Sequence, residues 1–126
     1  DGIHYPVAEL GQARLYFMHY ESEDEARELW EKRCSRINYD NIFVMMTDRD
    51  GCTLEDLQEF DSLPFVNKVV FTSKNHPEII STCYIPYFAG QESVGICSDY
   101  SGNYLGLRYL DAFDYISWFN GTRRAA

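Results

Sequence analysis

The chain has 126 residues, of which 45% are hydrophobic, 16% aromatic and 25% charged. This length fits one domain, and the composition is typical of a folded protein rather than a disordered one. Eleven basic residues against twenty acidic ones give a formal net charge of −9, which argues against nucleic acid or an anionic membrane surface as the main partner. No apolar run approaches the roughly 20 residues of a membrane-spanning helix, and no signal peptide opens the chain. We therefore expect a cytoplasmic protein without membrane insertion.

The chain begins at Asp1 without an initiator Met. We expect it to form a single α/β domain over residues 1–126 and to be the C-terminal part of a longer protein. Two disulfides are one interpretation of an even number of cysteines. We favour four reduced thiols packed in a cytoplasmic protein, because no Cys-x-x-Cys pair indicates a zinc ribbon or a thioredoxin-like site. The four cysteines are Cys34, Cys52, Cys83 and Cys97.

A β-hairpin is predicted first. The extended segments Val7–Leu10 and Ala13–Tyr20 flank Gly11-Gln12, which suits a type II′ turn. The second segment is apolar and aromatic almost throughout, so we expect it to be a central strand.

The clearest helix begins after Ser22. Ser22 and Glu25 have capping-box spacing, and acidic residues in the first turn and basic ones in the last match the helix dipole. One stripe at helical spacing is apolar except for a single arginine. This stripe consists of Ala26, Leu29, Trp30, Arg33 and Ile37.

Further strands and helices alternate along the chain, which predicts an α/β fold with a mainly parallel sheet, flanking helices and the N-terminal β-hairpin. We expect Leu15–His19, Ile42–Thr47 and Lys68–Thr72 to share one sheet, with the first two helices packed on it. Residues 87–110 are predicted as a long loop with an irregular strand near Val94–Cys97. The remaining elements are a helix capped by Thr53 and Asp56, a short strand at Ser81–Ile85, and a last helix that Asp111 with Asp114 opens and Gly121 ends.

The sharpest polar feature is Asp48-Arg49-Asp50-Gly51, which follows an apolar strand. Ligands of open α/β sheets bind beyond the carboxyl ends of the strands. Asp48 and Asp50 could share a divalent cation, Mg²⁺ or Mn²⁺, and the helix start that follows could bind phosphate. The alternative is a turn in which Asp50 caps the loop and Arg49 is a solvated charge.

His19 is expected near the end of its strand. If that strand and the one before Asp48 are parallel neighbours, the two side chains converge, and a histidine beside a carboxylate can act as a general base. The alternative is a hydrogen-bonded core histidine. Arg33 and Arg49 are candidates for binding a substrate phosphate. Because Arg33 lies on the apolar stripe, it should have a carboxylate partner, for which Asp48 or Asp50 is available. The alternative is that Arg33 and Arg36 only favour the C-terminus of their helix.

Tyrosines and glycines alternate over residues 84–109. Aromatic faces stack on pyranose rings, so this segment could form the rim of a sugar site. A packed surface loop is the alternative.

Several strings span residues 5–121, of which Thr47–Cys52 is the most specific. The strings are Tyr5-Pro6-Val7, Leu10-Gly11, Phe17-Met18-His19-Tyr20, Glu25-Ala26, Trp30, Arg33, Arg36, Thr47-Asp48-Arg49-Asp50-Gly51-Cys52, Phe60-Asp61, Leu63-Pro64, Lys68-Val69, Phe71-Thr72, Phe113-Asp114, Trp118 and Asn120-Gly121. Together they resemble the C-terminal two thirds of a bacterial family of unknown function, whose members are loosely labelled exopolysaccharide-biosynthesis or acetyltransferase proteins. The resemblance implies an α/β fold and a surface-polysaccharide setting, and it supplies no catalytic residues.

Two hypotheses of function follow. The first is an enzyme of cell-surface polysaccharide (exopolysaccharide) biosynthesis, a transferase acting on a sugar, sugar phosphate or nucleotide-sugar. In it, Asp48 and Asp50 hold the cation, His19 is the base, and Arg33 or Arg49 contacts phosphate. The second is a non-catalytic binding or scaffold domain, in which the same residues form a structural ion-pair network. Catalytic carboxylates should be reachable from a pocket, whereas structural ones should be covered and paired.

Overall fold

The structure, a computed structural model, describes residues 4–121. The chain divides into two compact units, residues 1–41 and residues 42–126. Whether they act as the single domain that we expected stays a prediction. A search of the described residues finds no helix with the length and apolarity needed to cross a membrane.

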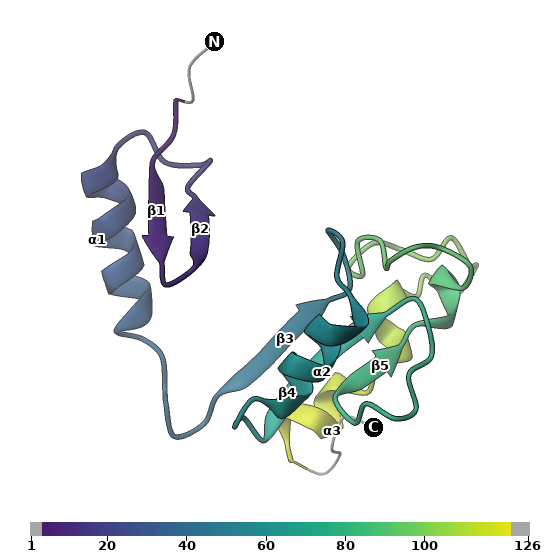
Figure 1. Cartoon of the computed structure of the whole chain (residues 1–126). Helices are drawn as coiled ribbons and strands as arrows, with labels where there is room; N and C mark the ends of the chain where they lie inside the picture. Colours follow the sequence, from purple (N-terminus) through teal and green to yellow (C-terminus); the bar gives the residue numbers. More distant parts are fainter. Residues whose placement is uncertain (1–3, 122–126) are drawn as a thin grey trace. The chain divides into compact units, whose positions relative to one another are not determined.

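The first unit is a hairpin followed by a helix (Figure 1). Strands β1 (Val7–Leu10) and β2 (Ala13–Tyr16) pair antiparallel. Gly11 in the turn has a φ of 61°, as the first central residue of a type II′ turn requires. The predicted hairpin and its turn are therefore confirmed.

The expected central strand over Leu15–His19 is wrong. Strand β2 ends at Tyr16 and pairs with β1 in a two-stranded sheet of its own. The chain then turns, with the Tyr20 N–H donating to the Phe17 carbonyl at 3.1 Å. Met18 within this turn is 63% exposed. No side chain of residues 15–20 is buried, since the described part of this unit contains a single helix that could cover them.

Helix α1 spans Glu23–Cys34. Ser22 accepts a hydrogen bond from the Glu25 N–H at 3.2 Å, as predicted. The Glu25 carboxylate, however, accepts from the N–H of Glu21 at 3.1 Å rather than from that of Ser22, so the capping box is only half formed. Trp30 packs edge-on against Phe17, with ring centroids 6.0 Å apart.

The second unit is built on a three-stranded parallel sheet in the order β3-β4-β5. The strands are β3 (Phe43–Thr47), β4 (Asn67–Thr72) and β5 (Thr82–Tyr84). The predicted parallel pairing of the two longer strands is confirmed, with Thr47 opposite Phe71. The expectation that all three apolar segments share one sheet is wrong, since the first of them stays in the hairpin.

Helix α2 (Leu54–Ser62) and helix α3 (Tyr115–Phe119) complete this unit. The predicted capping box of α2 is present, with the Thr53 N–H donating to Asp56 at 2.8 Å and the Asp56 N–H donating to Thr53 at 3.2 Å. The cap of α3 is Asp114, because the Asp111 carboxylate instead accepts from the Arg108 N–H at 2.7 Å.

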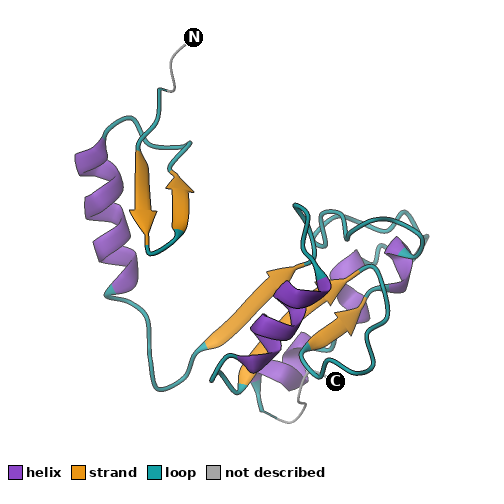
Figure 2. Cartoon of the chain, in the orientation of Figure 1, coloured by secondary structure: helices purple, strands orange, loops and turns teal. Residues whose placement is uncertain are grey.

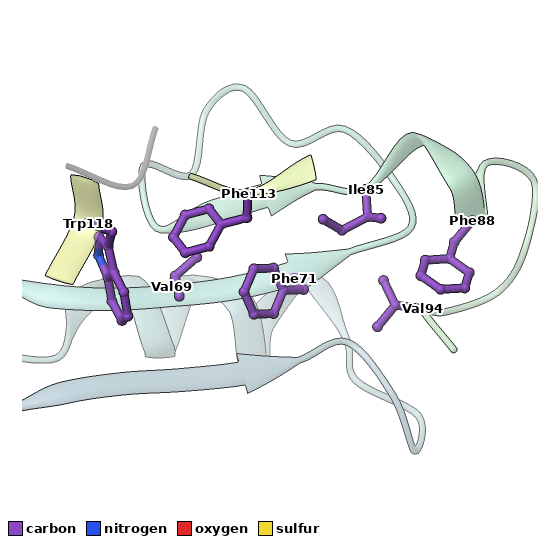
Figure 3. Packing of buried hydrophobic residues seen from close by; sticks show 7 residues of the cluster. All are labelled: Val69, Phe71, Ile85, Phe88, Val94, Phe113 and Trp118. Carbon is purple, nitrogen blue, oxygen red and sulfur yellow. The ribbon is translucent and has the colours of Figure 1, made fainter. Parts of the chain in front are cut away.

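Strand β4 is buried on both faces and separates two hydrophobic clusters. Val70 packs with Leu57 and Phe60 of α2 on one face. Val69 and Phe71 point to the opposite face, where seven residues form the larger cluster (Figure 3). These are Val69, Phe71, Ile85, Phe88, Val94, Phe113 and Trp118.

Most of the segment between β5 and α3 is irregular (Figure 2). It contains two short 3₁₀ helices, Pro86–Phe88 and Tyr109–Ala112. The predicted long loop is thus largely confirmed, but the irregular strand expected at Val94–Cys97 is not formed. An isolated antiparallel bridge joins Tyr100 to Arg108 instead.

Candidate functional site

Asp48 lies directly after β3, at the edge where the carboxyl ends of the three parallel strands meet. Its carboxylate joins two other segments of the chain. One oxygen accepts from the Ser73 N–H at 2.8 Å, and the Ser73 hydroxyl lies 3.2 Å away. The other oxygen accepts from the Val94 N–H at 2.7 Å. Asp48 therefore ties the end of β3 to the end of β4 and to the loop beyond β5.

The partners of Asp48 identify a structural role. Ser73 is 2% exposed and Val94 is 1% exposed, so their N–H groups would be left without water or a partner if the carboxylate were removed. Both hypotheses expected partners of another kind, a metal ion or an arginine. The carboxylate accepts hydrogen bonds from N–H and O–H donors instead, and it is half-buried and paired.

Asp50, two residues later, differs from Asp48 in its exposure and in its lack of hydrogen-bond partners among the described residues. It is exposed, and its φ of 60° makes it the sole non-glycine residue with a positive φ in the described part of the chain. Gly51 beside it has a φ of 80°. Within residues 4–121 the Asp50 side chain makes no hydrogen bond or ion pair, so the loop-capping role considered for it is not seen. Arg49 is also exposed and forms no ion pair with a described carboxylate.

A hollow of about 530 Å³ opens beside this turn, and we call it the carboxyl-edge hollow. Arg49 and Asp50 line it from the turn, and Asp56 and Glu59 line it from α2, whereas Asp48 is not among its lining residues. The remaining lining residues are Met46, Thr47, Gly51, Cys52, Phe60 and Leu63. The hollow thus places one guanidinium group among three carboxylates.

The thiols of Cys52 and Cys97 near the turn are poor nucleophiles. Burial, followed by the negative charges of Asp56 and Asp48, raises the pKa of Cys52. Burial, and then the charge of Asp48, raises the pKa of Cys97, while Arg49 partly opposes this shift. Because both pKa values are raised, both thiols stay protonated at neutral pH. The thiolate is the reactive form of cysteine, so neither group is an activated nucleophile. All four cysteines are half-buried, and no disulfide joins them.

The donor set for a divalent cation is incomplete in the described residues. No group of three or more His, Cys, Asp or Glu side chains able to hold a metal occurs between residues 4 and 121. Asp48 already uses both oxygens, and Asp50 supplies one carboxylate. The residues present therefore do not fit a cation shared by Asp48 and Asp50, and a Mg²⁺ or Mn²⁺ site stays a prediction.

The remaining predicted site residues belong to the first unit. His19 is exposed in the turn after β2. Its convergence with Asp48 was expected from two parallel neighbouring strands, but β2 and β3 belong to different sheets. Arg33 donates to the Tyr20 hydroxyl, and its guanidinium lies 5.8 Å from the centre of that ring. The Tyr20 hydroxyl is thus one partner of Arg33, which is exposed rather than buried. Its expected pairing with Asp48 or Asp50 stays a prediction.

Comparison with known proteins assigns the chain to a family. Residues 2–120 match a domain of unknown function, DUF1919. The chain belongs to the DUF1919 family. An uncharacterised protein of Haemophilus influenzae is 52% identical over 116 residues, which make up 92% of this chain and 56% of that relative. The chain thus spans about half the length of the curated relative, and no solved structure matches it.

Several residues that carried the family resemblance have structural tasks in this DUF1919 chain. Asp61 accepts from the Ser81 N–H at 2.8 Å, and Lys68 donates to the carbonyls of Asp61 and Leu63 at the end of α2. Phe113 and Trp118 are core residues. The exposed residues of the turn have no such task.

Sequence reasoning missed the carboxylates of α2 that line the hollow. Asp56 and Glu59 are three residues apart within the helix, which is the spacing of one helical face. That periodic signal was present, but Asp56 was interpreted only as a cap. Val94, the partner of Asp48, had no such signal because it lies 46 positions away.

Proposed function

We propose that this chain binds a sugar or sugar phosphate in the carboxyl-edge hollow, as part of a protein of cell-surface polysaccharide assembly. The conformation of Asp50 carries the proposal. A positive φ is uncommon for a residue with a Cβ atom, although Asp and Asn adopt it more readily than the others, and glycine would serve the turn at lower cost. Asp50 nevertheless extends a carboxylate into solvent beside the hollow. Backbone outliers of this kind cluster at binding sites.

The chemistry of the lining groups suits a polyhydroxylated ligand. Asp50 and Glu59 are acceptors for sugar hydroxyl groups, and the Arg49 guanidinium is a planar donor for phosphate or hydroxyl oxygens. Asp56 is engaged by Thr53 and contributes mainly charge. Three carboxylates around one arginine favour a ligand with many hydroxyl groups and little negative charge over a polyphosphate.

The hydrogen bonds of Asp48 favour a binding function of this chain over a catalytic one in which Asp48 takes part. Each of its two oxygens accepts a hydrogen bond from a buried N–H of the chain itself, so its main task is to hold the chain segments together at this edge of the sheet. This supports the non-catalytic alternative for residues 42–121. The surface-polysaccharide setting rests on the family resemblance of the sequence.

Calorimetric titration with hexose 1-phosphates and nucleotide-sugars, with Mn²⁺ or with chelator, tests the proposal. We expect Arg49→Gln and Asp50→Asn each to weaken binding about 10- to 100-fold, the loss of one charged hydrogen bond. Arg14→Gln is the matched control, because Arg14 is an exposed residue of the first unit that forms a surface pair with Glu9. Unchanged affinity in both turn variants, or no binding of any ligand, would contradict the proposal.

A further inference from the structure

Asp50 and Gly51 form a pair that can react with each other. An aspartate followed by a glycine can close a five-membered succinimide ring, because no side chain on the glycine shields its amide nitrogen from the aspartate Cγ atom. Between residues 4 and 121, Asp50 is the sole aspartate that a glycine follows. The other such pair in the chain, Asp1-Gly2, lies outside the described residues.

The structure leaves both reacting groups of this pair exposed and without hydrogen bonds. Within residues 4–121 the Asp50 carboxylate makes no hydrogen bond or ion pair, and the Gly51 N–H donates to no acceptor. The turn is closed by the next residue instead, through a hydrogen bond from the Cys52 N–H to the Arg49 carbonyl at 3.3 Å. A Cβ atom placed on Gly51 would meet no heavy atom within 4 Å. The space beside Gly51 is therefore open.

Two neighbouring aspartates are held away from this reaction. Asp48 is half-buried, and its oxygens accept hydrogen bonds from the N–H groups of Ser73 and Val94. The carboxylate of Asp56 accepts from the N–H and the hydroxyl of Thr53, both at 2.8 Å. Neither Cγ atom can turn toward the following nitrogen without breaking these bonds. Asp50 has no such restraint.

An asparagine–glycine pair at the end of α3 meets the same sequence requirement in a different structure. The Gly121 N–H donates to the Trp118 carbonyl at 3.1 Å, so its nitrogen must give up a hydrogen bond before it can attack Asn120. The glycine nitrogen is thus engaged in this pair and unengaged in the turn after β3.

We propose that Asp50 is a modification site, at which the native turn converts aspartate into isoaspartate through a succinimide. The Gly51 nitrogen attacks the Asp50 Cγ atom, and a C–N bond forms as the amide proton and the carboxyl hydroxyl leave together as water. Hydrolysis returns one water and opens the ring at either carbonyl. Opening at the former peptide carbonyl leaves the main chain running through Cβ and Cγ, which is isoaspartate. The reaction needs no oxidant, reductant or cofactor.

This conversion changes the shape of the turn but not its charge. Isoaspartate adds one methylene group to the main chain between Arg49 and Cys52, so the hydrogen bond that closes the turn cannot keep its present geometry. Arg49 and Asp50 both line the carboxyl-edge hollow, and their relative placement changes with the turn. The modification depends on the turn alone, whereas its effect on ligand binding rests on the proposed function.

Peptide mapping of the whole chain, after incubation in mildly acidic water enriched in ¹⁸O, tests the proposal. A protonated carboxyl loses water more readily than a carboxylate, and each ring that closes and reopens incorporates one ¹⁸O atom. Electron-transfer fragmentation distinguishes isoaspartate from aspartate at residue 50. We expect labelled isoaspartate there, at a rate within about tenfold of that in guanidinium chloride. A site that reacts only in the unfolded chain would be slower by about a thousandfold or more.

Two variants at residue 50 serve as matched controls. Asp50→Glu keeps a carboxylate but would have to close a six-membered ring, which forms far more slowly, so it should gain no label at this residue. Asp50→Asn tolerates a positive φ and should react through the same ring with loss of ammonia in place of water. A folded-state rate more than about tenfold below that of the unfolded chain overturns the proposal. Equal amounts of isoaspartate at Asp48, or a folded Asp50→Asn that loses no ammonia, would also overturn it.

Titration of the fresh and the isomerised chain with glucose 1-phosphate separates this proposal from the proposed function. We expect the isomerised chain to bind at least about tenfold more weakly. If residue 50 isomerises but the fresh chain binds no sugar phosphate, or if both forms bind equally well, the proposed function of the hollow fails alone. If the fresh chain binds and residue 50 does not isomerise, the modification site fails alone.

Discussion

The two units of this chain differ in what their apolar residues achieve. Within the described residues of the first unit, Ala26 alone is buried, although the unit carries a tryptophan and several tyrosines. The second unit buries Trp118, Phe113 and Val69 to 2% exposure or less. Both are rich in apolar residues, so composition does not explain the difference.

The two units differ in how many layers of secondary structure pack against their strands, and this explains the difference in burial. In the second unit, β4 is covered by α2 on one face and by the larger hydrophobic cluster on the other, as a two-faced core requires. The described residues of the first unit form two short strands and one helix, so the unit taken by itself has no second layer on its hairpin beyond that helix. The difference extends to polar groups, because Asp48 can be held by three donors only where buried segments fix those donors in place.

The two tryptophans test this comparison most strongly. Trp118 is 1% exposed and packs against Phe43 and Phe113, whereas Trp30 is 43% exposed. We expect Trp118→Ala to lower the free energy of unfolding of the second unit by about 3–5 kcal/mol. Trp30→Ala should change the stability by no more than about 1 kcal/mol. Urea denaturation followed by far-ultraviolet circular dichroism measures both. Equal losses would show that Trp30 is covered in solution, and the contrast between the units would then fail.

The two aspartates of the turn give a smaller contrast. Asp48→Asn places an amide N–H₂ against donors of the chain, so at least one buried N–H loses its acceptor, and we expect a loss of about 1–3 kcal/mol. Asp50→Asn is the matched change two residues away. It should alter stability by less than about 0.5 kcal/mol, because asparagine tolerates a positive φ. Thermal melting compares the two variants, and a larger loss in Asp50→Asn would exchange the roles that the structure assigns.

Short-range sequence patterns correctly predicted those elements that depend only on residues close together in the sequence. The capping box of Thr53 and Asp56, the positive φ of Gly11 and the apolar run of β4 each depend on neighbours within a few positions. The assignment of Leu15–His19 to the main sheet failed for a different reason. An apolar and aromatic run has the same appearance whether it is a central strand or the exposed arm of a hairpin, and only its pairing partners decide.

The sequence predicted the position of the candidate site at the sheet edge, but not the different roles of its two aspartates. The turn at residues 48–51 does lie at the carboxyl edge of a parallel sheet, as its position after an apolar strand indicated. Which carboxylate is structural depends on Ser73 and Val94, which lie 25 and 46 positions away. No local pattern encodes such a contact, so Asp48 and Asp50 appeared equivalent in the sequence.

The smallest expected effect is a pH dependence at the start of α2. Hydrogen bonds from the Thr53 N–H and hydroxyl hold the pKa of Asp56 below its ordinary value of 3.8. A carboxyl whose pKa is lower in the folded protein than in the unfolded one stabilises the fold when it is ionised. This contribution is fully present above the unfolded pKa and is lost as the pH falls through the folded pKa.

We therefore expect the melting temperature of the wild type to fall more steeply between about pH 4 and pH 2 than that of Asp56→Asn, which lacks the titrating group. The two melting temperatures should differ most near neutral pH and approach each other in acid. Glu55→Gln removes a charge from the same helical turn without touching the capping box, so it should keep the wild-type slope. If Glu55→Gln flattened the profile as much as Asp56→Asn, the general charge of the first turn, and not the hydrogen bonds of Asp56, would be the cause.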